Sequence, residues 1–218
     1  TPDGSVEPVA SKVAPVPTTA VIHLSGSLGL EVLGTHPRRG SLHPLVPLPN
    51  EVVGAERLRS GATFAVAGDP VTRYLADVLG GRAVEVDDRD RVVYHAAASI
   101  AANHLVALIG QVERLAATVG LPLEAFAGLL HAATDDALAL GPSRALTGPA
   151  ARGDWDTVER HRAALSGLAG HRTELAAYDA MVGLARRLSM DAAADGSPGD
   201  VTRTVPVPVA PTDVGQVA

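Results

Sequence analysis

The stretch Thr19-Ala20-Val21-Ile22-His23-Leu24, followed by Ser25-Gly26-Ser27, decides the fold class of the first part of the chain. A short β-branched and aliphatic run that ends in small turn-forming residues is typical of a buried strand in a parallel sheet. Similar short runs predict further strands over residues 40–44, 63–67 and 83–86. Because helical patterns alternate with these strands, the sequence predicts an α/β fold built on a parallel sheet.

The segments between the strands have their own signals. Valines at helical spacing predict a short helix over residues 4–14, which Pro15 ends. Asp69 followed by Pro70 is the pattern of an N-cap and first helical residue, and it predicts a helix that runs to Leu79. Residues 45–60 are expected to form a proline-rich connection.

The pattern changes after Asp88, where strand signals stop. Helices are predicted over about residues 90–119, 123–140, 154–168 and 173–190, with a loop over 143–153. The last residues repeat Val-Pro and contain no aromatic residue, which is typical of a disordered or polyproline-like tail. We therefore expect an α/β domain over residues 1–89, an all-α domain over 90–190 and a disordered tail over 191–218.

The first of these helices is unusually apolar. No residue between Arg91 and Glu113 carries a formal charge, so the segment is long enough to span a bilayer. Its alanines and scattered polar residues instead favour a helix that is buried on most sides of a helical bundle, without a membrane. Because such a helix needs packing partners all round, we expect a homodimer formed through residues 90–119.

Composition excludes several functions. The chain has 218 residues and a net charge of -6, and it lacks the basic face of a general nucleic-acid-binding protein. It contains no Cys, which excludes a disulfide scaffold, thiolate zinc sites and a Cys nucleophile. Its eight His show no metal-ligand spacing near a carboxylate cluster, so no metal site is expected.

Two candidate sites lie where strands end. In an open parallel sheet, ligands bind beyond the carboxyl ends of the strands. Ser25 and Gly26 follow the first strand there, although an ordinary strand-to-helix turn would have the same sequence. His43 ends the next strand and should point to the same edge, where an imidazole can act as base or hydrogen-bond donor near neutral pH. The alternative is a His that only closes a turn.

Two further candidates lie in the helical part. His95, Ser99 and Asn103 recur every four residues, so an α-helix would place them on one slanted stripe that could line an elongated cleft. They could equally be satisfied polar residues inside a helical interface. Thr147 and Arg152 could contact an anionic group, while a plain interhelical loop is the default interpretation of their segment.

Four motifs of the sequence together resemble one protein family. They are Ile22-His-Leu-Ser-Gly-Ser-Leu-Gly, Ser41-Leu-His-Pro, Tyr94-His-Ala-Ala-Ala with Asn103, and Ala145-Leu-Thr-Gly-Pro with Arg152-Gly-Asp154. Over about residues 1–188 the chain resembles Rossmann-like oxidoreductases that carry the C-terminal helical domain of unknown function 2520. These lie near pyrroline-5-carboxylate reductase, the 6-phosphogluconate-dehydrogenase-like enzymes and deazaflavin-dependent NADP oxidoreductases.

The resemblance implies a cytoplasmic enzyme with a partial Rossmann-like sheet, an all-α dimerisation domain and NADP or NAD as cofactor. Members of that family begin with a strand, a G-x-G-x-x-G loop and about two more βαβ units, which are absent from this sequence. By the resemblance, the first three residues follow the family's fourth strand, and we expect a fragment of a larger enzyme or a truncated paralogue. The residues implied to touch the cofactor are Thr1, Pro2, Asp3, Ser25 and Gly26.

A looser likeness suggests roles. Prephenate dehydrogenases carry a similar Ser and His-Pro, which implies that Ser25 contacts substrate or nicotinamide and that His43 bonds a hydroxyl being oxidised. Ketopantoate reductases carry a polar stripe that implies an orienting or protonating role for His95 with Asn103. From their positions in the sequence, Ser99, Thr147 and Arg152 are expected to contact the substrate. The expected function is NAD(P)-dependent oxidation or reduction of a small carbonyl, imine or hydroxy compound. The alternative is a non-catalytic dimeric binding or scaffold module that lacks the cofactor half.

Overall fold

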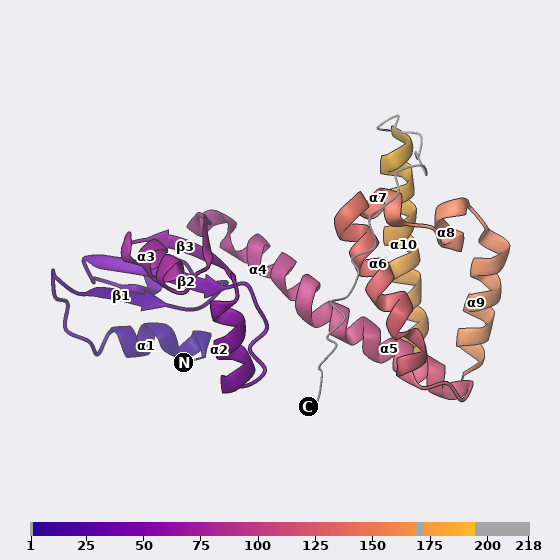
Figure 1. The fold of residues 1–218 in the computed structure, drawn as a ribbon, viewed down its shortest axis with the longest axis horizontal. Coiled ribbons are helices and arrows are strands. Elements are labelled where there is room, and N and C mark those ends of the chain that lie inside the picture. The colour runs from indigo at the N-terminus through magenta and orange to yellow at the C-terminus, as the bar shows by residue number, and fades with distance from the viewer. Residues whose placement is uncertain (1, 169–171, 195–218) are drawn as a thin grey trace, which may run out of the picture. The chain divides into compact units, whose positions relative to one another are not determined.

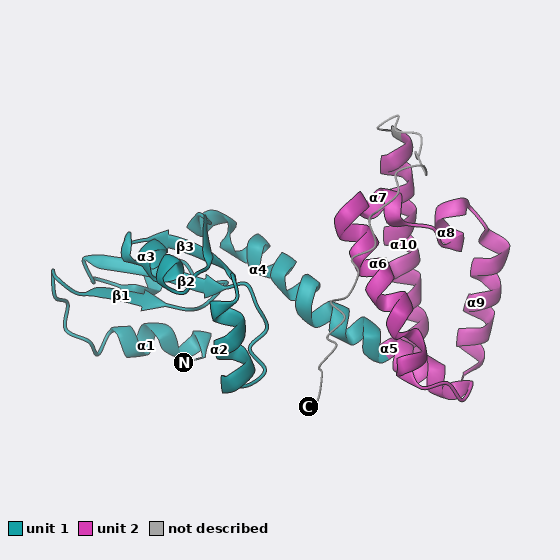
Figure 2. Cartoon of the chain, in the orientation of Figure 1, with its two compact units in different colours: residues 1–110 teal, residues 111–218 magenta. Residues whose placement is uncertain are grey.

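The computed structural model describes residues 2–168 and 172–194. The chain forms two compact units, residues 1–110 and 111–218, and each is described by itself (Figures 1 and 2). The division between Gly110 and Gln111 lies further along the chain than the expected boundary at residue 89. The first turns of the long helix belong to unit 1, where Tyr94 and His95 contact His43 at the end of β2.

Unit 1 contains a four-stranded sheet in the order β1-β2-β3-β4. The strands are β1 (Ala20–His23), β2 (Arg38–Pro44), β3 (Thr63–Gly68) and β4 (Arg82–Glu85). The α/β class is confirmed, and the pairs β1–β2 and β3–β4 are parallel as predicted. The pair β2–β3 is antiparallel, which corrects the expectation of a wholly parallel sheet. The connection after β2 returns the chain at the same end of the sheet, so the next strand must run the other way.

Unit 1 contains the two predicted helices and further helical segments between the strands. They are η1 (Asp3–Ser5), α1 (Val6–Ala10), η2 (Leu30–Leu33), α2 (Glu51–Arg59) and α3 (Val71–Val78). Helix α2 corrects the predicted connection over 45–60, and the Asn50 side chain caps it by accepting a hydrogen bond from Val53 N at 3.0 Å. Asp69 caps the start of α3 as expected, accepting from Val71 N at 3.0 Å.

The core of unit 1 joins β2, β3 and α3. Its buried members are Leu42, Ala62, Phe64, Val66 and Ala76. These are small and branched side chains around a single Phe, in keeping with a sequence of which only 3% is aromatic. The packed sheet holds the carboxyl ends of β1 and β2 at one edge, with His23 of β1 opposite Ser41 of β2.

The long helix consists of η3 (Asp88–Asp90), α4 (Arg91–Ser99), the π-helical turn η4 (Ile100–His104) and α5 (Leu105–Thr118). By length and composition, Asp88–Thr118 is able to cross a membrane, with a mean hydropathy of 1.6 in its most apolar window. None of that window is buried in the described structure, so the expectation of a helix buried on most sides is wrong for the single chain. The described part of one chain supplies too few neighbouring elements to cover so long an apolar helix.

Unit 2 is helical throughout its described residues, as predicted. Its elements after α5 are η5 (Leu123–Phe126), α6 (Ala127–Leu140), α7 (Pro142–Ala145), α8 (Pro149–Arg152), α9 (Trp155–Gly167) and α10 (Arg172–Ala194). Helices α7 and α8 correct the predicted loop over 143–153. Each begins with a Pro, whose fixed φ suits the first helical turn.

The far end of unit 2 also differs from the prediction. Asp191–Ala194 continue α10 because alanine is the best helix former, so the expected tail does not begin at 191. The rest of that predicted tail lies outside the described residues.

Two side chains of α5 connect it to α10. Gln111 Nε2 donates a hydrogen bond to the Glu174 carbonyl at 2.9 Å, and Arg114 Nε donates to the Glu174 carboxylate at 2.6 Å.

Candidate functional site

The turn after β1 forms a closed hydrogen-bond network with η1. The Ser25 and Ser27 hydroxyls donate to Asp3 Oδ2 at 2.8 and 2.9 Å. The backbone N–H groups of Ser27 and Leu28 both donate to Ser25 Oγ at 3.2 Å. The Ser25 hydroxyl is therefore engaged within the turn, and its contact with substrate or nicotinamide stays a prediction. Of the implied cofactor residues, Asp3, Ser25 and Gly26 come together here, Pro2 adjoins them in sequence, and Thr1 lies outside the described residues.

His43 is the centre of a group of three rings. Its Nδ1 lies 2.7 Å from the Tyr94 hydroxyl, and the two rings are edge to face with centroids 5.7 Å apart. The His95 ring lies edge to face with His43 at the same centroid distance of 5.7 Å. The end of β2 and the first turns of α4 thus bring together the two histidines that the sequence singled out. Tyr94 belongs to the quoted motif, but sequence reasoning assigned it no role.

Gly26 makes this arrangement possible. A Cβ at Gly26 would lie 2.5 Å from His95 Cδ2 and 2.9 Å from both Cε1 and Nε2 of His43. Such distances are far below van der Waals contact, so only glycine lets the turn approach both imidazoles. The parallel pairing of β1 and β2 places this turn and His43 at one edge of the sheet, where the sequence predicts them.

Burial and charge set the protonation of the three rings. Burial, followed by the positive charges of His95 and Arg91, lowers the pKa of His43 below 6.5. Burial raises the pKa of Tyr94 above 10.0. Near neutral pH, His43 is therefore a neutral imidazole beside a phenol that keeps its proton.

Sequence reasoning missed a buried charge beneath this group. The Arg91 side chain has no exposed surface, and within the described residues its nitrogens have no hydrogen-bond acceptor. Its nearest carboxylate is Asp88, with Arg91 Nε to Asp88 Oδ1 at 3.6 Å. Both ring nitrogens of buried His23 are likewise without a partner in the described part of the chain. The only sequence signal for Arg91 is a charge at the start of a long uncharged helix.

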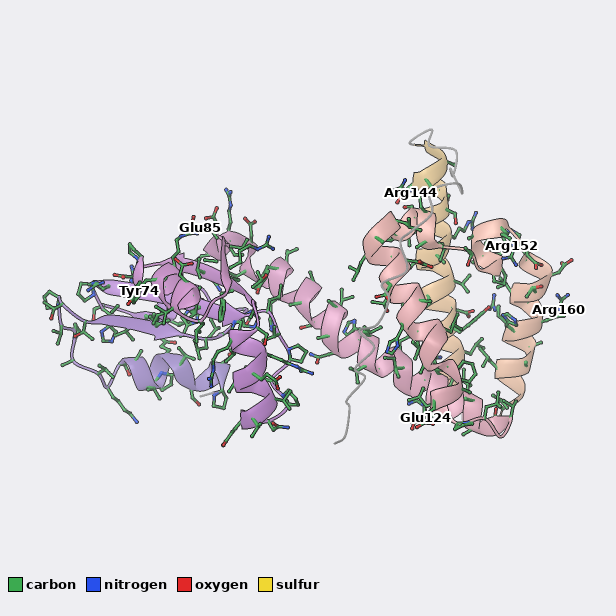
Figure 3. All side chains as sticks on the ribbon, viewed as in Figure 1. Tyr74, Glu85, Glu124, Arg144, Arg152 and Arg160 are labelled. Atoms are coloured by element: carbon green, nitrogen blue, oxygen red, sulfur yellow. The ribbon has the colours of Figure 1, made fainter. Side chains whose placement is uncertain are left out.

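The remaining candidates are not part of the ring group. Ser99 is half-buried one turn further along α4, and Asn103 is exposed within the π-helical turn. Because a π-helical turn changes the rotation per residue, the predicted α-helical stripe of His95, Ser99 and Asn103 is interrupted, which corrects that expectation. In unit 2 the exposed Arg152 guanidinium (Figure 3) donates to the Thr147 carbonyl, so these two predicted residues do meet each other.

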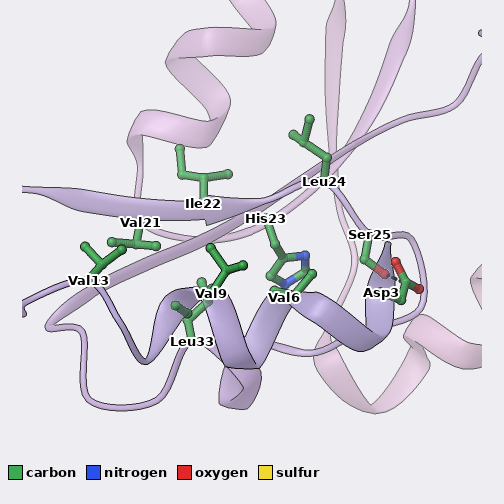
Figure 4. A pocket seen from close by; sticks show the side chains of 11 residues that line it. Asp3, Val6, Val9, Val13, Val21, Ile22, His23, Leu24, Ser25 and Leu33 are labelled. Carbon is green, nitrogen blue, oxygen red and sulfur yellow. Dashed lines mark hydrogen bonds between the residues drawn. The ribbon is translucent and has the colours of Figure 1, made fainter. Parts of the chain in front are cut away.

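A separate pocket of about 360 Å³ lies between α1 and β1 (Figure 4). Its wall is mostly aliphatic, and His23, Ser25 and Asp3 supply its polar side chains. The described residues contain no group of three His, Asp or Glu side chains that could hold a metal ion.

A comparison with protein families shows which family the chain belongs to. The profile of a domain of unknown function, DUF2520, matches residues 63–184, which is more than half of the sequence. The chain belongs to the DUF2520 family. The match covers β3, β4, the long helix with Tyr94 and His95, and the helices of unit 2 as far as α10.

Solved structures share the fold of this DUF2520 protein. Protein TM1727 from Thermotoga maritima is 26% identical with a TM-score of 0.73, and the match covers 88% of this chain and 76% of that one. BF3122 from Bacteroides fragilis, named for an inferred NADP oxidoreductase activity, is 20% identical with a TM-score of 0.71, covering 86% and 73%. Pyrroline carboxylate reductase from Plasmodium falciparum, solved with NADP bound, matches too loosely to carry an argument, at 13% identity and a TM-score of 0.47 over 85% and 75%. No curated protein matches the sequence.

Proposed function

We propose that this DUF2520 protein is an NAD(P)-dependent oxidoreductase that acts on a small carbonyl, imine or hydroxy compound. The observation that carries the proposal is the contact of two imidazoles, His43 and His95, at the carboxyl edge of an α/β sheet and against Gly26. Ligands of open α/β sheets bind at this edge, and paired imidazoles can donate or accept the proton of a redox reaction.

We place one end of a nicotinamide cofactor at this group of rings. The imidazoles of His43 and His95 already fill the space beside Gly26, so a bound nicotinamide would contact the rings themselves rather than enter between them and that glycine. Such a cofactor supplies the hydride, while the protein contributes orientation and a proton. The sequence holds no G-x-G-x-x-G loop for the pyrophosphate. We choose NADP as the cofactor because the name of the structurally similar protein BF3122 includes NADP.

The proposed roles follow the geometry. His43 exchanges a proton with the substrate, and His95, in contact with it, orients the substrate. Asp3, Ser25 and Gly26 shape the turn that faces nicotinamide. Contacts of Ser99, Asn103, Thr147 and Arg152 with substrate are further parts of the proposal, as is a cytoplasmic location.

NADPH titration tests the function. We would follow nicotinamide fluorescence on adding the complete gene product, and in parallel the 218-residue chain. Saturable binding by the complete product, unchanged in affinity when Arg89 is replaced by Met, is the expected result, since Arg89 is a largely exposed residue outside the ring group. Absence of any saturable binding by the complete product would overturn the proposal.

A second function is favoured by the exposure of the long helix. Val92, Val93, Ile100 and Val106 are each more than half exposed on it. Contiguous apolar surface of this kind marks an interaction site. We propose that two copies pair through residues 90–119, and that a non-catalytic dimeric scaffold is the alternative should NADPH not bind. Mass measurement in solution distinguishes a dimer from a monomer.

A further inference from the structure

The hydrogen bond between Tyr94 and His43 bears on which nitrogen of the His43 ring carries the proton. The 2.7 Å separation of Tyr94 Oη and His43 Nδ1 is that of an ordinary hydrogen bond, and both rings lie in the part-buried region of unit 1. In the neutral imidazole one nitrogen carries the proton and the other accepts, so the partner of Nδ1 decides what Nε2 does. Nε2 is on the edge of the ring that faces Gly26.

The direction of this hydrogen bond follows from the partners that are available. Among the described residues, His43 Nδ1 is the one hydrogen-bond partner of the Tyr94 hydroxyl. If His43 Nδ1 donated, the phenol proton would have no acceptor among the described residues, whereas a donating phenol satisfies both the Tyr94 hydroxyl and His43 Nδ1. The phenol is also the group that keeps its proton, since burial raises the pKa of Tyr94 and lowers that of His43.

We propose that Tyr94 is a positioning residue that holds His43 in the tautomer whose Nε2 carries the proton. His43 Nε2, on the ring edge beside Gly26, is then a hydrogen-bond donor, and a substrate that reaches this edge would be a carbonyl or imine to be reduced rather than a hydroxyl to be oxidised. This substrate class rests on the proposed oxidoreductase function, and it reverses the role for His43 that the likeness to prephenate dehydrogenases implies.

The proton balance of the reduction is complete. A reduced nicotinamide bound at this site would supply the hydride, whose electron pair forms the new C–H bond. The carbonyl oxygen takes the proton from His43 Nε2, and Nδ1 takes the proton of the Tyr94 hydroxyl, which returns His43 to a neutral form. The tyrosinate that results is close enough to the buried Arg91 charge to be stabilised by it, and solvent then reprotonates it.

Nitrogen-15 NMR of the histidine rings tests this without substrate or cofactor. At about pH 8, well above the usual imidazole pKa, the Nδ1 and Nε2 shifts report the tautomer directly. Histidine-labelled protein should show His43, assigned with His43→Asn, with its proton on Nε2. Tyr94→Phe keeps the ring that packs on His43 but removes the hydroxyl, and it should shift His43 toward a mixture of tautomers.

The chain provides its own control for that experiment. His161 Nδ1 lies 2.9 Å from the Tyr178 hydroxyl, with the rings edge to face at 5.9 Å, but this pair is exposed in unit 2. Tyr178→Phe should leave the His43 shifts unchanged. A His43 proton on Nδ1, or His43 shifts that Tyr94→Phe does not move, would overturn the inference while leaving NADPH binding intact. Loss of NADPH binding with the predicted tautomer present would instead contradict only the proposed function.

Discussion

Gly26 shows how a single residue without a side chain sets the geometry of the ring group. Replacing it with Ala places a methyl group 2.5 Å from His95 Cδ2, so at least one imidazole must move. We expect Gly26→Ala to lower the free energy of unfolding by about 1–3 kcal/mol, the usual cost of overpacking, and to shift the ring signals of His43 and His95. Urea unfolding and proton NMR measure the two effects.

Gly128 in helix α6 is the matched control for that substitution. A Cβ there meets no atom of the described structure within 4 Å. Gly128→Ala should raise the stability by up to about 1 kcal/mol, since alanine has the higher helix propensity. Equal effects at the two glycines would contradict the account of Gly26.

The histidines of unit 1 make its stability depend on pH. Burial lowers the pKa of both His23 and His43 below 6.5, so the unfolded chain takes up protons at these sites more readily than the folded one. Their contribution to stability is therefore full above pH 6.5 and is lost as the pH falls through and below that value. Urea unfolding across this range, with His43→Gln beside wild type, should show a shallower loss in the variant; identical slopes would contradict the assigned direction.

The residues in and around the ring group differ in how well the sequence predicts them. His43, Gly26 and Ser25 were predictable because parallel strands bring their carboxyl ends together, and His95 because its motif suggested a polar stripe. Arg91 and His23 were not, because their side chains are buried without hydrogen-bond partners among the described residues, and burial depends on tertiary packing. Tyr94 needed the distance to His43 before a role could be assigned.

Among the elements, helix α2 depends on a cap that the sequence analysis overlooked. Asn50 accepts from Val53 N at 3.0 Å, and the prolines before it obscured the helix start. Asn50→Ala should destabilise the protein by about 1 kcal/mol, while Asn50→Asp, which keeps an acceptor, should be close to wild type. Thermal unfolding measures the stability of both variants. Equal losses of stability in the two variants would show that the hydrogen bond accepted by the Asn50 side chain does not stabilise the helix.

Two properties of the helices and strands were hardest to predict from the sequence: the direction of each strand and the rotation per residue along the long helix. An apolar run predicts a strand but not the direction in which its neighbour lies, which is why the antiparallel β2–β3 pair was missed. A spacing of four residues assumes α-helical rotation, so the π-helical turn at Ile100–His104 displaced Asn103 from its predicted stripe.

At the scale of the whole molecule, the exposed long helix forms the proposed dimer interface. Val93 and Val106 are 74% and 68% exposed in the single chain. If two copies pair there, Val93→Asp and Val106→Asp should each convert the dimer to a monomer in light scattering, because a buried carboxylate is costly. Leu138→Asp, at an 83% exposed position on α6, is the control and should remain dimeric. A wild-type monomer would contradict the pairing.

The central claim is that nicotinamide sits against His43 and His95. The most direct test is the nuclear Overhauser effect between the C4 hydrogens of bound NADPH and the imidazole ring protons of the complete gene product. The account predicts cross-peaks to His43 and His95 and none to His161, which lies in unit 2. Bound NADPH whose C4 hydrogens contact neither imidazole would contradict it.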